Sequence, residues 1–482
     1  MKLRELLSGV SVLACTADME MEISGVSYDS RSVRPGDLFV AMTGFAVDGH
    51  KFIAAAQEKG AAAALCQKEP GGTLPYVRTE DSRRALAIVG ANWFGHPAKE
   101  MTMVAVTGTC GKTTTTYLLK AILEQAAGAK VGLIGTNQNM IGDAALPTDR
   151  TTPESFEVQK LFREMADAGC THVVMETSSH ALYLDRVYGV HYDVGVFTNL
   201  TQDHLDFHKT MESYCDAKAI LFRNCSVGVV NADDPWTPRL LKDAACRVMT
   251  YAERAEADLR AEHIALSADG IAFDAVTETE RVPVRVHIPG GFMVYNTLDV
   301  LGAALALGIP LKDSAAVLAG VPHVQGRVEV IPTPGKDYTI LIDYAHTPDS
   351  MVNVLRTVKE FAKGRTVAVF GCGGARSRLR RFGMGSVCAR LADFCIITED
   401  NSRGEPVEHI LADIRAGLRL GNPATPFAEI PDRRQAIYYA LDHAQPGDII
   451  AILGKGHETT IERGGIKEPF VEREIVEEYW RR

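Results

Sequence analysis

The pattern of apolar and polar positions in the middle of this 482-residue chain repeats a short apolar run followed by a helix-forming stretch. The apolar runs lie at residues 104–106, 131–134, 172–175 and 194–197. Continuous apolar strands separated by helices are typical of a parallel sheet covered on both faces. Ligands of such sheets bind beyond the C-terminal strand ends, so the polar residues that follow these runs are the candidates for a site.

The flanking stretches also alternate strands and helices. Residues 1–98 combine turn residues with a strand at 38–41 and a helix from 52 that ends at or just before Gly60, which predicts a small α/β module. Residues 331–482 place strands at 339–342, 366–370, 394–398 and 449–453, which predicts a second nucleotide-binding-like fold. Residues 247–290 alternate as a hairpin would, with a turn at 267–270 and a strand at 281–288, before a helix at 295–307.

The first strand of the middle stretch runs into a glycine-rich turn, VAVTGTCGKTTTT at 104–116, and then into a helix-forming segment at 117–127. Backbone N–H groups of such a turn and the following helix N-terminus bind phosphate oxygens, while Lys112 would reach the outer phosphates and Thr113 would offer a hydroxyl to Mg²⁺. The turn is shorter than a Walker A loop, and the alternative is an ordinary glycine-rich turn. The residues expected at the phosphates are Gly108, Thr109, Gly111, Lys112, Thr113 and Thr114.

These elements predict an α/β protein of three domains: a small N-terminal α/β module (1–98), a central P-loop-type parallel-sheet domain (99–330) and a C-terminal Rossmann-like domain (331–482). A net charge of −10 argues against a general polyanion binder, so we expect no nucleic-acid partner. Ten cysteines without a C-x-x-C pair indicate reduced thiols. Because we find neither a signal peptide nor a bilayer-spanning apolar run, we expect a cytoplasmic protein with no membrane partner.

Several polar residues follow the predicted strands of the middle domain. Glu176 could hold a metal ion or cap the next helix, and the phosphate-binding turn upstream favours the metal. Residues 203–208 contain two aspartates and two histidines, a cluster that suits a divalent cation and phosphate as well as it suits a structural part. Lys218 lies in a helix-forming stretch, and spacing alone predicts a solvated lysine.

Polar clusters also follow the strands of the last domain, at residues 343–349, 371–377, 399–405 and 454–458. The run GCGG at 371–374 is only a weak signal for dinucleotide binding, because a third glycine and the expected acid are absent. Two cations and one anion, Arg376, Arg403 and Glu458, are better suited to the carboxylate and amine of a small zwitterion.

Ordered motifs over nearly the whole chain resemble those of the Mur ligases, the ATP-dependent peptide synthetases of bacterial cell-wall precursor assembly, and most of all the members that add the third amino acid. The motifs that carry the resemblance are SYDSRSVRPGDLFVAMTG (27–44), VTGTCGKTTTT (106–116), TTPE (151–154), METSSHAL (175–182), FTNLTQDHLDFH (197–208), AK (217–218), DYAHTPD (343–349), GCGG (371–374), DNSR (400–403) and GKGHE (454–458).

The resemblance implies roles that spacing cannot give. It implies catalytic roles for Lys112, Lys218, His204 and His346, and metal ligation by Thr113, Glu176, His204 and Lys218, the last as a CO₂-derived carbamate. It places Asn296, Arg327 and Asp343 at the ATP, and Ser30, Thr151, Thr152, Ser178 and Arg186 at a UDP-muramyl-peptide. The incoming amino acid would meet Arg376, Asp400, Asn401, Ser402, Arg403, Gly454 and Glu458.

The implied reaction transfers the γ-phosphoryl group of ATP to the D-glutamyl side-chain carboxylate of UDP-N-acetylmuramoyl-L-Ala-D-Glu. Mg²⁺ and Lys112 would offset the crowded negative charge, and an amine would then attack the acyl phosphate, after domain closure that excludes water. Family members that use meso-diaminopimelate carry Asp-Asn-Pro-Arg, whose arginine pairs with the distal carboxylate. Here residues 400–403 are DNSR, which favours meso-diaminopimelate but leaves lysine or another diamino acid open.

Some positions depart from the family pattern: Cys110, Leu184, Met293, Ala375, Ser377 and Ser402. Two other readings stay open. One is a P-loop phosphotransferase that forms no amide, although such an enzyme has no reason to carry Arg376, Arg403 and Glu458. The other is a degenerate family member kept as a scaffold. The presence of Lys112 and Lys218 argues against this interpretation. We expect a monomer.

Overall fold

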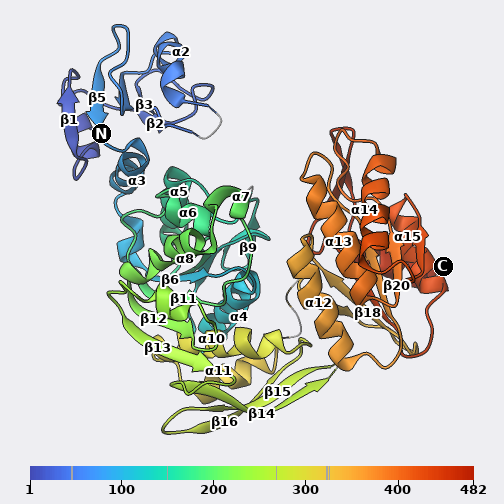
Figure 1. Cartoon of the computed structure of the whole chain (residues 1–482). Coiled ribbons are helices and arrows are strands. Elements are labelled where there is room, and N and C mark those ends of the chain that lie inside the picture. The colour runs from blue at the N-terminus through green and yellow to red at the C-terminus, as the bar shows by residue number, and fades with distance from the viewer. Residues whose placement is uncertain (45–46, 149, 268, 322–323, 325) are drawn as a thin grey trace. The chain divides into compact units, whose positions relative to one another are not determined.

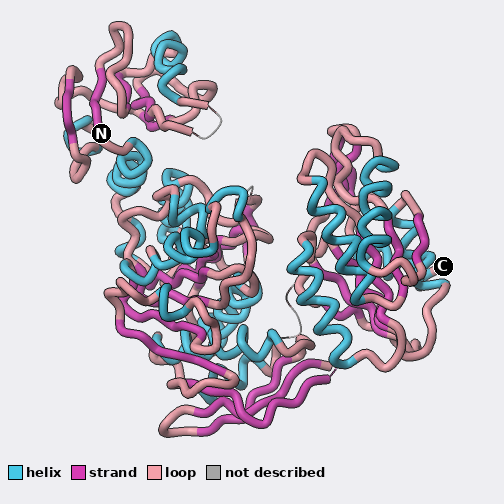
Figure 2. Tube along the Cα trace, viewed as in Figure 1, coloured by secondary structure: helices cyan, strands magenta, loops and turns pink. Residues whose placement is uncertain are grey.

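The computed structural model describes residues 1–44, 47–148, 150–267, 269–321, 324 and 326–482. The chain forms two compact units. The first contains Met1–Thr116, Leu123–Val230 and Asp234–Met249, and the second contains Tyr117–Ile122, Asn231–Asp233 and Thr250–Arg482. Figure 1 labels the elements, and Figure 2 distinguishes helices from strands. None of the helices in the described ranges is both long and apolar enough to cross a membrane.

The first unit begins with a sheet in the order β1-β5-β4-β3-β2, in which only β1 is antiparallel to its neighbour. The predicted strand at 38–41 is confirmed as β3, and the predicted helix before Gly60 is confirmed as α2. The strands are β1 (Val12–Cys15), β2 (Gly25–Ser27), β3 (Asp37–Val40), β4 (Ala63–Cys66) and β5 (Tyr76–Thr79). The helices are α1 (Leu3–Leu6), η1 (Gly49–Phe52), α2 (Ile53–Glu58) and α3 (Ser82–Trp93).

The rest of the first unit is built on strands in the order β12-β11-β6-β10-β7-β8-β9. The first five are parallel, which confirms the predicted parallel sheet. Glu176 at the end of β10 pairs with Val106, and Phe197 at the end of β11 pairs with Thr107, so both strands end beside the glycine-rich turn. The strands are β6 (Thr102–Thr107), β7 (Val131–Ile134), β8 (Asn139–Ile141), β9 (Ala144–Leu146), β10 (His172–Glu176), β11 (Tyr192–Phe197) and β12 (Cys225–Asn231).

Helices α5, α6 and α8 pack on one face of this sheet, where Phe162 and Tyr214 join a core with Met175 of β10. The helices are η2 (Pro97–Glu100), α4 (Lys112–Gln125), α5 (Ser155–Asp167), α6 (Ser179–Tyr183), α7 (Leu205–His208), α8 (Met211–Ala219), η3 (Leu221–Arg223) and α9 (Thr237–Leu240). Helix α4 begins at Lys112, so the start predicted at residue 117 is wrong. Threonine has a low helix propensity, but Thr115 and Thr116 are fully buried, and packing outweighs that propensity.

The second unit starts with β14, β15 and β16, which form an antiparallel ribbon, while β13 pairs with β14 in parallel. The predicted strand at 281–288 is confirmed as far as Val286, and the turn predicted at 267–270 includes Ala268, which lies outside the described residues. The elements are β13 (Arg247–Ala252), β14 (Leu259–Ser267), β15 (Gly270–Val276), β16 (Arg281–Val286), α10 (Phe292–Ala306) and α11 (Leu311–Leu318).

The remainder of the second unit is a sheet in the order β17-β18-β22-β19-β20-β21, parallel except for β17. Helices α15 and α16 cover one face, and α12, α13 and α14 lie along the other (Figure 1). The strands are β17 (Glu329–Ile331), β18 (Thr339–Asp343), β19 (Thr366–Phe370), β20 (Phe394–Ile397), β21 (Phe427–Glu429), β22 (Ile449–Leu453), β23 (Thr460–Arg463) and β24 (Ile466–Pro469). The helices are α12 (Pro348–Phe361), α13 (Arg378–Leu391), α14 (Val407–Gly421), α15 (Arg433–Asp442) and α16 (Glu472–Arg481).

The register of this sheet brings four predicted motifs to one edge. Asp343 of β18 and Phe370 of β19 both pair with Leu453 of β22, and Phe370 also pairs with Ile397 of β20. The residues that follow these four strand ends are therefore neighbours. All four strands predicted from apolar runs are confirmed here.

Candidate functional site

The glycine-rich turn after β6 is tied to the end of β11. Thr109 donates its backbone N–H to the Asn199 carbonyl (2.9 Å), and the Cys110 N–H donates to Asn199 Oδ1 (3.0 Å). Lys112, the first residue of α4, folds back and donates its ammonium to the carbonyls of Gly108 and Thr109, both at 2.9 Å. The turn thus lies beside the N-terminus of α4, where helix N–H groups can bind an oxyanion, and phosphate binding by this turn stays a prediction.

Glu176 lies beside this turn, at the end of β10. Its carboxylate accepts hydrogen bonds from the Thr113 hydroxyl, the Thr136 N–H and the Thr136 hydroxyl, each at 2.9 Å. The next helix is capped by Ser178, whose hydroxyl accepts from the Ala181 N–H, so the helix-cap reading of Glu176 is wrong. A hydroxyl and a carboxylate side by side at the glycine-rich turn are oxygen donors of the kind that Mg²⁺ prefers, so these residues fit the predicted metal.

Lys218 of α8 is buried, with 1% of its surface exposed, so the solvated lysine predicted from spacing is wrong. Its Nζ donates to the Gly108 carbonyl at 2.9 Å, the same oxygen that Lys112 binds, and lies 4.6 Å from the centre of the Tyr214 ring. Burial, and then the positive charge of Lys112, hold the pKa of Lys218 well below its usual value. A neutral amine is the form that can react with an electrophile.

His204 begins α7 in a left-handed conformation (φ 53°), with Nε2 3.4 Å from Asp203. Burial lowers the pKa of His204, which favours the neutral ring with a free lone pair. His208 instead packs on the Tyr214 ring and bonds to the Ser179 hydroxyl at 2.9 Å. Within the described ranges no three His, Cys, Asp or Glu side chains are grouped to hold a metal, so residues 203–208 are not a metal site by themselves.

The residues predicted for the peptide lie on the other side of Glu176. The Thr151 and Thr136 hydroxyls are 2.9 Å apart, and the Thr152 hydroxyl donates to the Glu176 carbonyl at 2.8 Å. The Ser178 N–H donates back to the Thr152 hydroxyl at 3.1 Å, and Arg186 donates to the Thr152 carbonyl at 3.1 Å. These hydrogen bonds connect the residues predicted to bind the peptide with Glu176, the residue predicted to bind the metal ion.

A cluster of arginines next to Arg186 was missed by sequence reasoning. Glu154 Oε2 lies 3.5 Å from Arg83, 3.5 Å from Arg186 and 3.9 Å from Arg150. The three arginines come from distant parts of the chain, so no local spacing could have joined them. Burial lowers the pKa of Arg186.

Ser30, predicted at the uridine diphosphate, lies half-buried in the turn after β2. In this turn the Asp29 carboxylate accepts from the Arg31 N–H at 2.9 Å and from its guanidinium at 2.7 Å. Asp29 and Arg31 thus stabilise this turn.

A cavity of about 130 Å³ opens at the C-terminal strand ends of the last sheet. It is lined by six of the seven residues predicted to bind the amino acid, Arg376, Asp400, Asn401, Arg403, Gly454 and Glu458, together with Tyr344 and His346. The seventh, Ser402, is buried and does not line the cavity. Arg403 has φ 54° and donates its guanidinium to the Gly374 carbonyl at 2.6 Å, with Nε 3.7 Å from Glu462.

The residues predicted at the nucleotide lie near this cavity or in α10. Asp343 accepts from the N–H groups of Val328 (2.8 Å) and Ala345 (2.7 Å), and burial raises its pKa. Arg327 stacks over the Tyr344 ring at 5.1 Å. Burial lowers the pKa of His346. Asn296 is buried in α10, with Nδ2 3.7 Å from Met293 Sδ.

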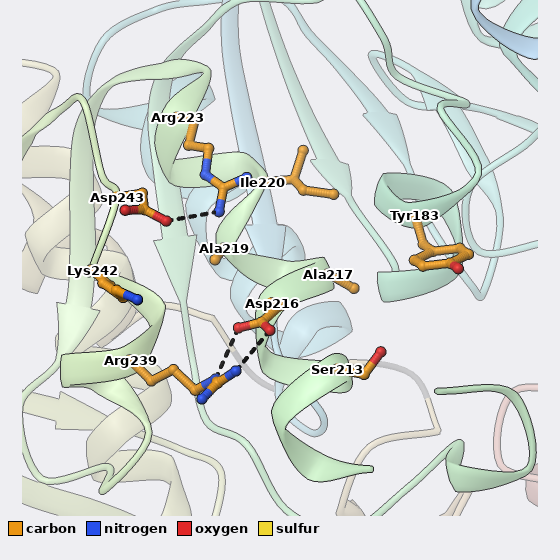
Figure 3. Close-up of a pocket in the computed structure, with 10 residues that line it drawn as sticks. All are labelled: Tyr183, Ser213, Asp216, Ala217, Ala219, Ile220, Arg223, Arg239, Lys242 and Asp243. Atoms are coloured by element: carbon orange, nitrogen blue, oxygen red, sulfur yellow. Dashed lines mark hydrogen bonds and ion pairs between the residues drawn. The ribbon is translucent and has the colours of Figure 1, made fainter. Parts of the chain in front are cut away.

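A second cavity, of about 350 Å³, lies against the outer side of α8 (Figure 3). Its walls carry two ion pairs, Arg239 with Asp216 at 2.8 Å and Arg223 with Asp243 at 3.4 Å. These four side chains are exposed, and none of the predicted site residues lines the cavity. Solvated pairs of this kind contribute little binding energy, so we assign no function to it.

Comparisons with known proteins agree with this geometry. Three family models match the chain: the Mur ligase family catalytic domain at 22–98, the Mur ligase middle domain at 106–304, and the Mur ligase glutamate ligase domain at 326–456. The chain therefore belongs to the Mur ligase family. The UDP-N-acetylmuramoyl-L-alanyl-D-glutamate--2,6-diaminopimelate ligase of Clostridium botulinum is 44% identical to this chain, and the match covers 95% of each chain. The ligase of the same name from Caldanaerobacter subterraneus is also 44% identical, and the match covers 99% of this chain and 98% of the relative.

Solved structures support the same assignment. A structure of a UDP-N-acetylmuramoyl-L-alanyl-D-glutamate--2,6-diaminopimelate ligase matches with a TM-score of 0.71 and 31% identity, covering 99% of this chain and 98% of that one. The MurF ligase of Thermotoga maritima in complex with ADP shares the fold at a TM-score of 0.62 and 19% identity, covering 94% and 96%.

Proposed function

We propose that this protein is an ATP-dependent amide ligase that adds meso-diaminopimelate to UDP-N-acetylmuramoyl-L-alanyl-D-glutamate in peptidoglycan precursor synthesis. The observation that carries the proposal is the cavity in which Arg376, Arg403 and Glu458 meet. Two guanidiniums and a carboxylate suit an amino acid with two carboxylates and two amines. The relatives that match nearly the whole chain bear the name of this activity.

The first chemical step would activate a carboxylate, because a carboxylate does not react with an amine at neutral pH. Lys112 and the N–H groups of the turn would hold the ATP phosphates, and the γ-phosphoryl group would pass to the D-glutamyl carboxylate. Mg²⁺ would be held by Thr113, Glu176, His204 and carbamylated Lys218, and when bound it would offset the negative charge on the phosphates. The neutral amine of the amino acid would then attack the acyl phosphate and release phosphate.

Carbamylation of Lys218 is supported by its burial. The neutral Nζ would add to the carbon of CO₂ and lose a proton to solvent, which leaves an anionic carbamate in place of an amine. The low pKa of Lys218 supplies the nucleophilic form, and the hydrogen bond to Gly108 places it beside the phosphate-binding turn. The carbamate would provide one more oxygen donor for the metal.

The other assignments complete the proposal. Asn296, Arg327, Asp343 and His346 would contact the nucleotide, and Ser30, Thr151, Thr152, Ser178 and Arg186 the UDP-muramyl-peptide. We further propose domain boundaries near residues 98 and 330, a monomer, and a location in the cytoplasm, where ATP and a UDP-linked substrate are available. No nucleic-acid or membrane partner enters the reaction.

The test is phosphate release with ATP, Mg²⁺ and UDP-N-acetylmuramoyl-L-Ala-D-Glu, with the product mass read in parallel for meso-diaminopimelate, LL-diaminopimelate, lysine and ornithine. We expect phosphate release and a tripeptide mass with meso-diaminopimelate only. Turnover with lysine would keep the ligase and overturn the amino-acid assignment. Phosphate release without an amide from any amine would overturn the ligase in favour of a phosphotransferase.

Gly374→Ala is expected to weaken amino-acid binding selectively. A Cβ at this position would lie 1.9 Å from the Ser402 carbonyl oxygen, so residues 400–403 would have to move. We expect the KM for the amino acid to rise about tenfold or more and the free energy of unfolding to fall by about 1–3 kcal/mol. The control is Gly404→Ala, because a Cβ there meets no atom within 4 Å. Equal effects of the two substitutions on KM would contradict the prediction.

A further inference from the structure

Lys455 lies in the turn after β22, between two glycines, and its side chain is completely buried (0% exposed). A buried ammonium is tolerated only where polar or anionic groups replace its hydration. Its Nζ donates to Glu458 Oε2 at 2.6 Å and to Asn401 Oδ1 at 3.2 Å. Lys455 thus binds two residues of the cavity wall from behind, although it does not line the cavity itself.

The ammonium fixes the orientation of the Asn401 amide. Asn401 Oδ1 accepts from Lys455 and from the Glu462 N–H (2.9 Å), while Nδ2 donates to Glu458 Oε2 (2.9 Å). Because an ammonium has only donors, it can face only the oxygen of the amide. A flipped Asn401 would direct Nδ2 at both donors, so Lys455 excludes that arrangement.

Glu458 is fixed in the same way. Lys455 Nζ and Asn401 Nδ2 both donate to Glu458 Oε2, and no residue of the described ranges hydrogen-bonds Glu458 Oε1. The side chain is 29% exposed and lines the cavity. Glu472 is paired with Arg433 at 2.7 Å, whereas Glu458 forms the direct ion pair with Lys455 at 2.6 Å.

We propose that Lys455 is the positioning residue of the amino-acid site: it binds Glu458 and Asn401 from behind and so directs Glu458 Oε1 to an amine of the incoming diamino acid. This inference rests on the proposed ligase function. Its two side-chain hydrogen bonds, to Asn401 and Glu458, both reach residues proposed to bind the amino acid, so we expect its effect to fall on that one substrate.

The experiment compares the three KM values of Lys455→Met with those of the wild type. Methionine keeps the length of the buried side chain but leaves Glu458 and Asn401 without the ammonium. We expect the KM for meso-diaminopimelate to rise at least about tenfold, with the KM values for ATP and for the UDP-linked substrate unchanged. Lys467→Met is the control, since Lys467 is an exposed residue of the neighbouring hairpin.

A double-mutant cycle shows whether Lys455 acts through Glu458. In a Glu458→Gln background, Lys455→Met is expected to raise the KM for diaminopimelate little further. If the two substitutions instead raise the KM for diaminopimelate independently, so that their fold-changes multiply in the double variant, Lys455 does not act through Glu458 and the proposal is overturned. An equal rise in all three KM values would likewise overturn it and indicate a purely structural lysine. If Lys455→Met does not fold, Lys455→Gln is measured instead: its uncharged amide offers an acceptor as well as a donor and so no longer fixes the Asn401 amide, and the same selective rise in KM is expected. A wild type that forms no amide would instead overturn the proposed function.

Discussion

Lys218→Met is expected to lower the rate of amide formation by about a thousandfold while leaving the free energy of unfolding unchanged or higher. The rate falls because methionine cannot become a carbamate, so an anionic group near the ATP phosphates and the metal is lost. Stability is kept because the lysine is buried and its amine must be desolvated, whereas methionine has a similar length and is apolar. The Gly108 carbonyl still accepts from Lys112.

The measurement pairs product formation with urea unfolding for the same variant. Lys160→Met is the matched control, because Lys160 is an exposed lysine of α5 that pairs with Glu164 on the surface of the same helix. In ¹³C-labelled bicarbonate, a carbamate carbon resonance is expected from the wild type and not from Lys218→Met. Activity of Lys218→Met within about tenfold of the wild type would refute a role for the carbamate.

The fold could be predicted where strands are buried on both faces. The runs at 366–370 and 449–453 coincide with β19 and β22, because every residue of these strands is buried and therefore apolar or small. The strands β1 (VLAC) and β9 (AAL) are also apolar, but they are short edge strands with exposed positions, and they were not predicted. The start of α4 was misplaced because local propensity, which is poor for threonine, is overruled by packing.

The site could be predicted where one motif carries it, and not where distant segments meet. Thr113 follows from the phosphate-binding turn, and its hydrogen bond to Glu176 agrees with the pairing of two strand ends. The burial of Lys218 depends on how α8 packs on the sheet, which spacing cannot show. Lys455 lies inside a recognised motif, but only the structure shows that it is buried beneath Glu458.

Arg403→Ala is expected to remove the preference for meso-diaminopimelate over lysine. The Arg403 backbone N–H donates to the Glu462 carbonyl at 3.0 Å, which anchors the residue to β23, and its guanidinium reaches the cavity. A guanidinium can bind the distal carboxylate in a bidentate pair, and lysine has no such carboxylate. We expect kcat/KM for meso-diaminopimelate to fall about a hundredfold or more, with little change for lysine.

The measurement is kcat/KM for both amino acids with each variant at saturating ATP and UDP-linked substrate. Arg415→Ala serves as the control, because Arg415 is a half-buried arginine of α14 whose ion pair within the described ranges is with Glu429, at 2.7 Å. If Arg403→Ala lowered kcat/KM equally for lysine and meso-diaminopimelate, the arginine would hold the loop through Gly374 rather than select the distal carboxylate. A selective loss would instead place the distal carboxylate at Arg403 and leave the amine to Glu458.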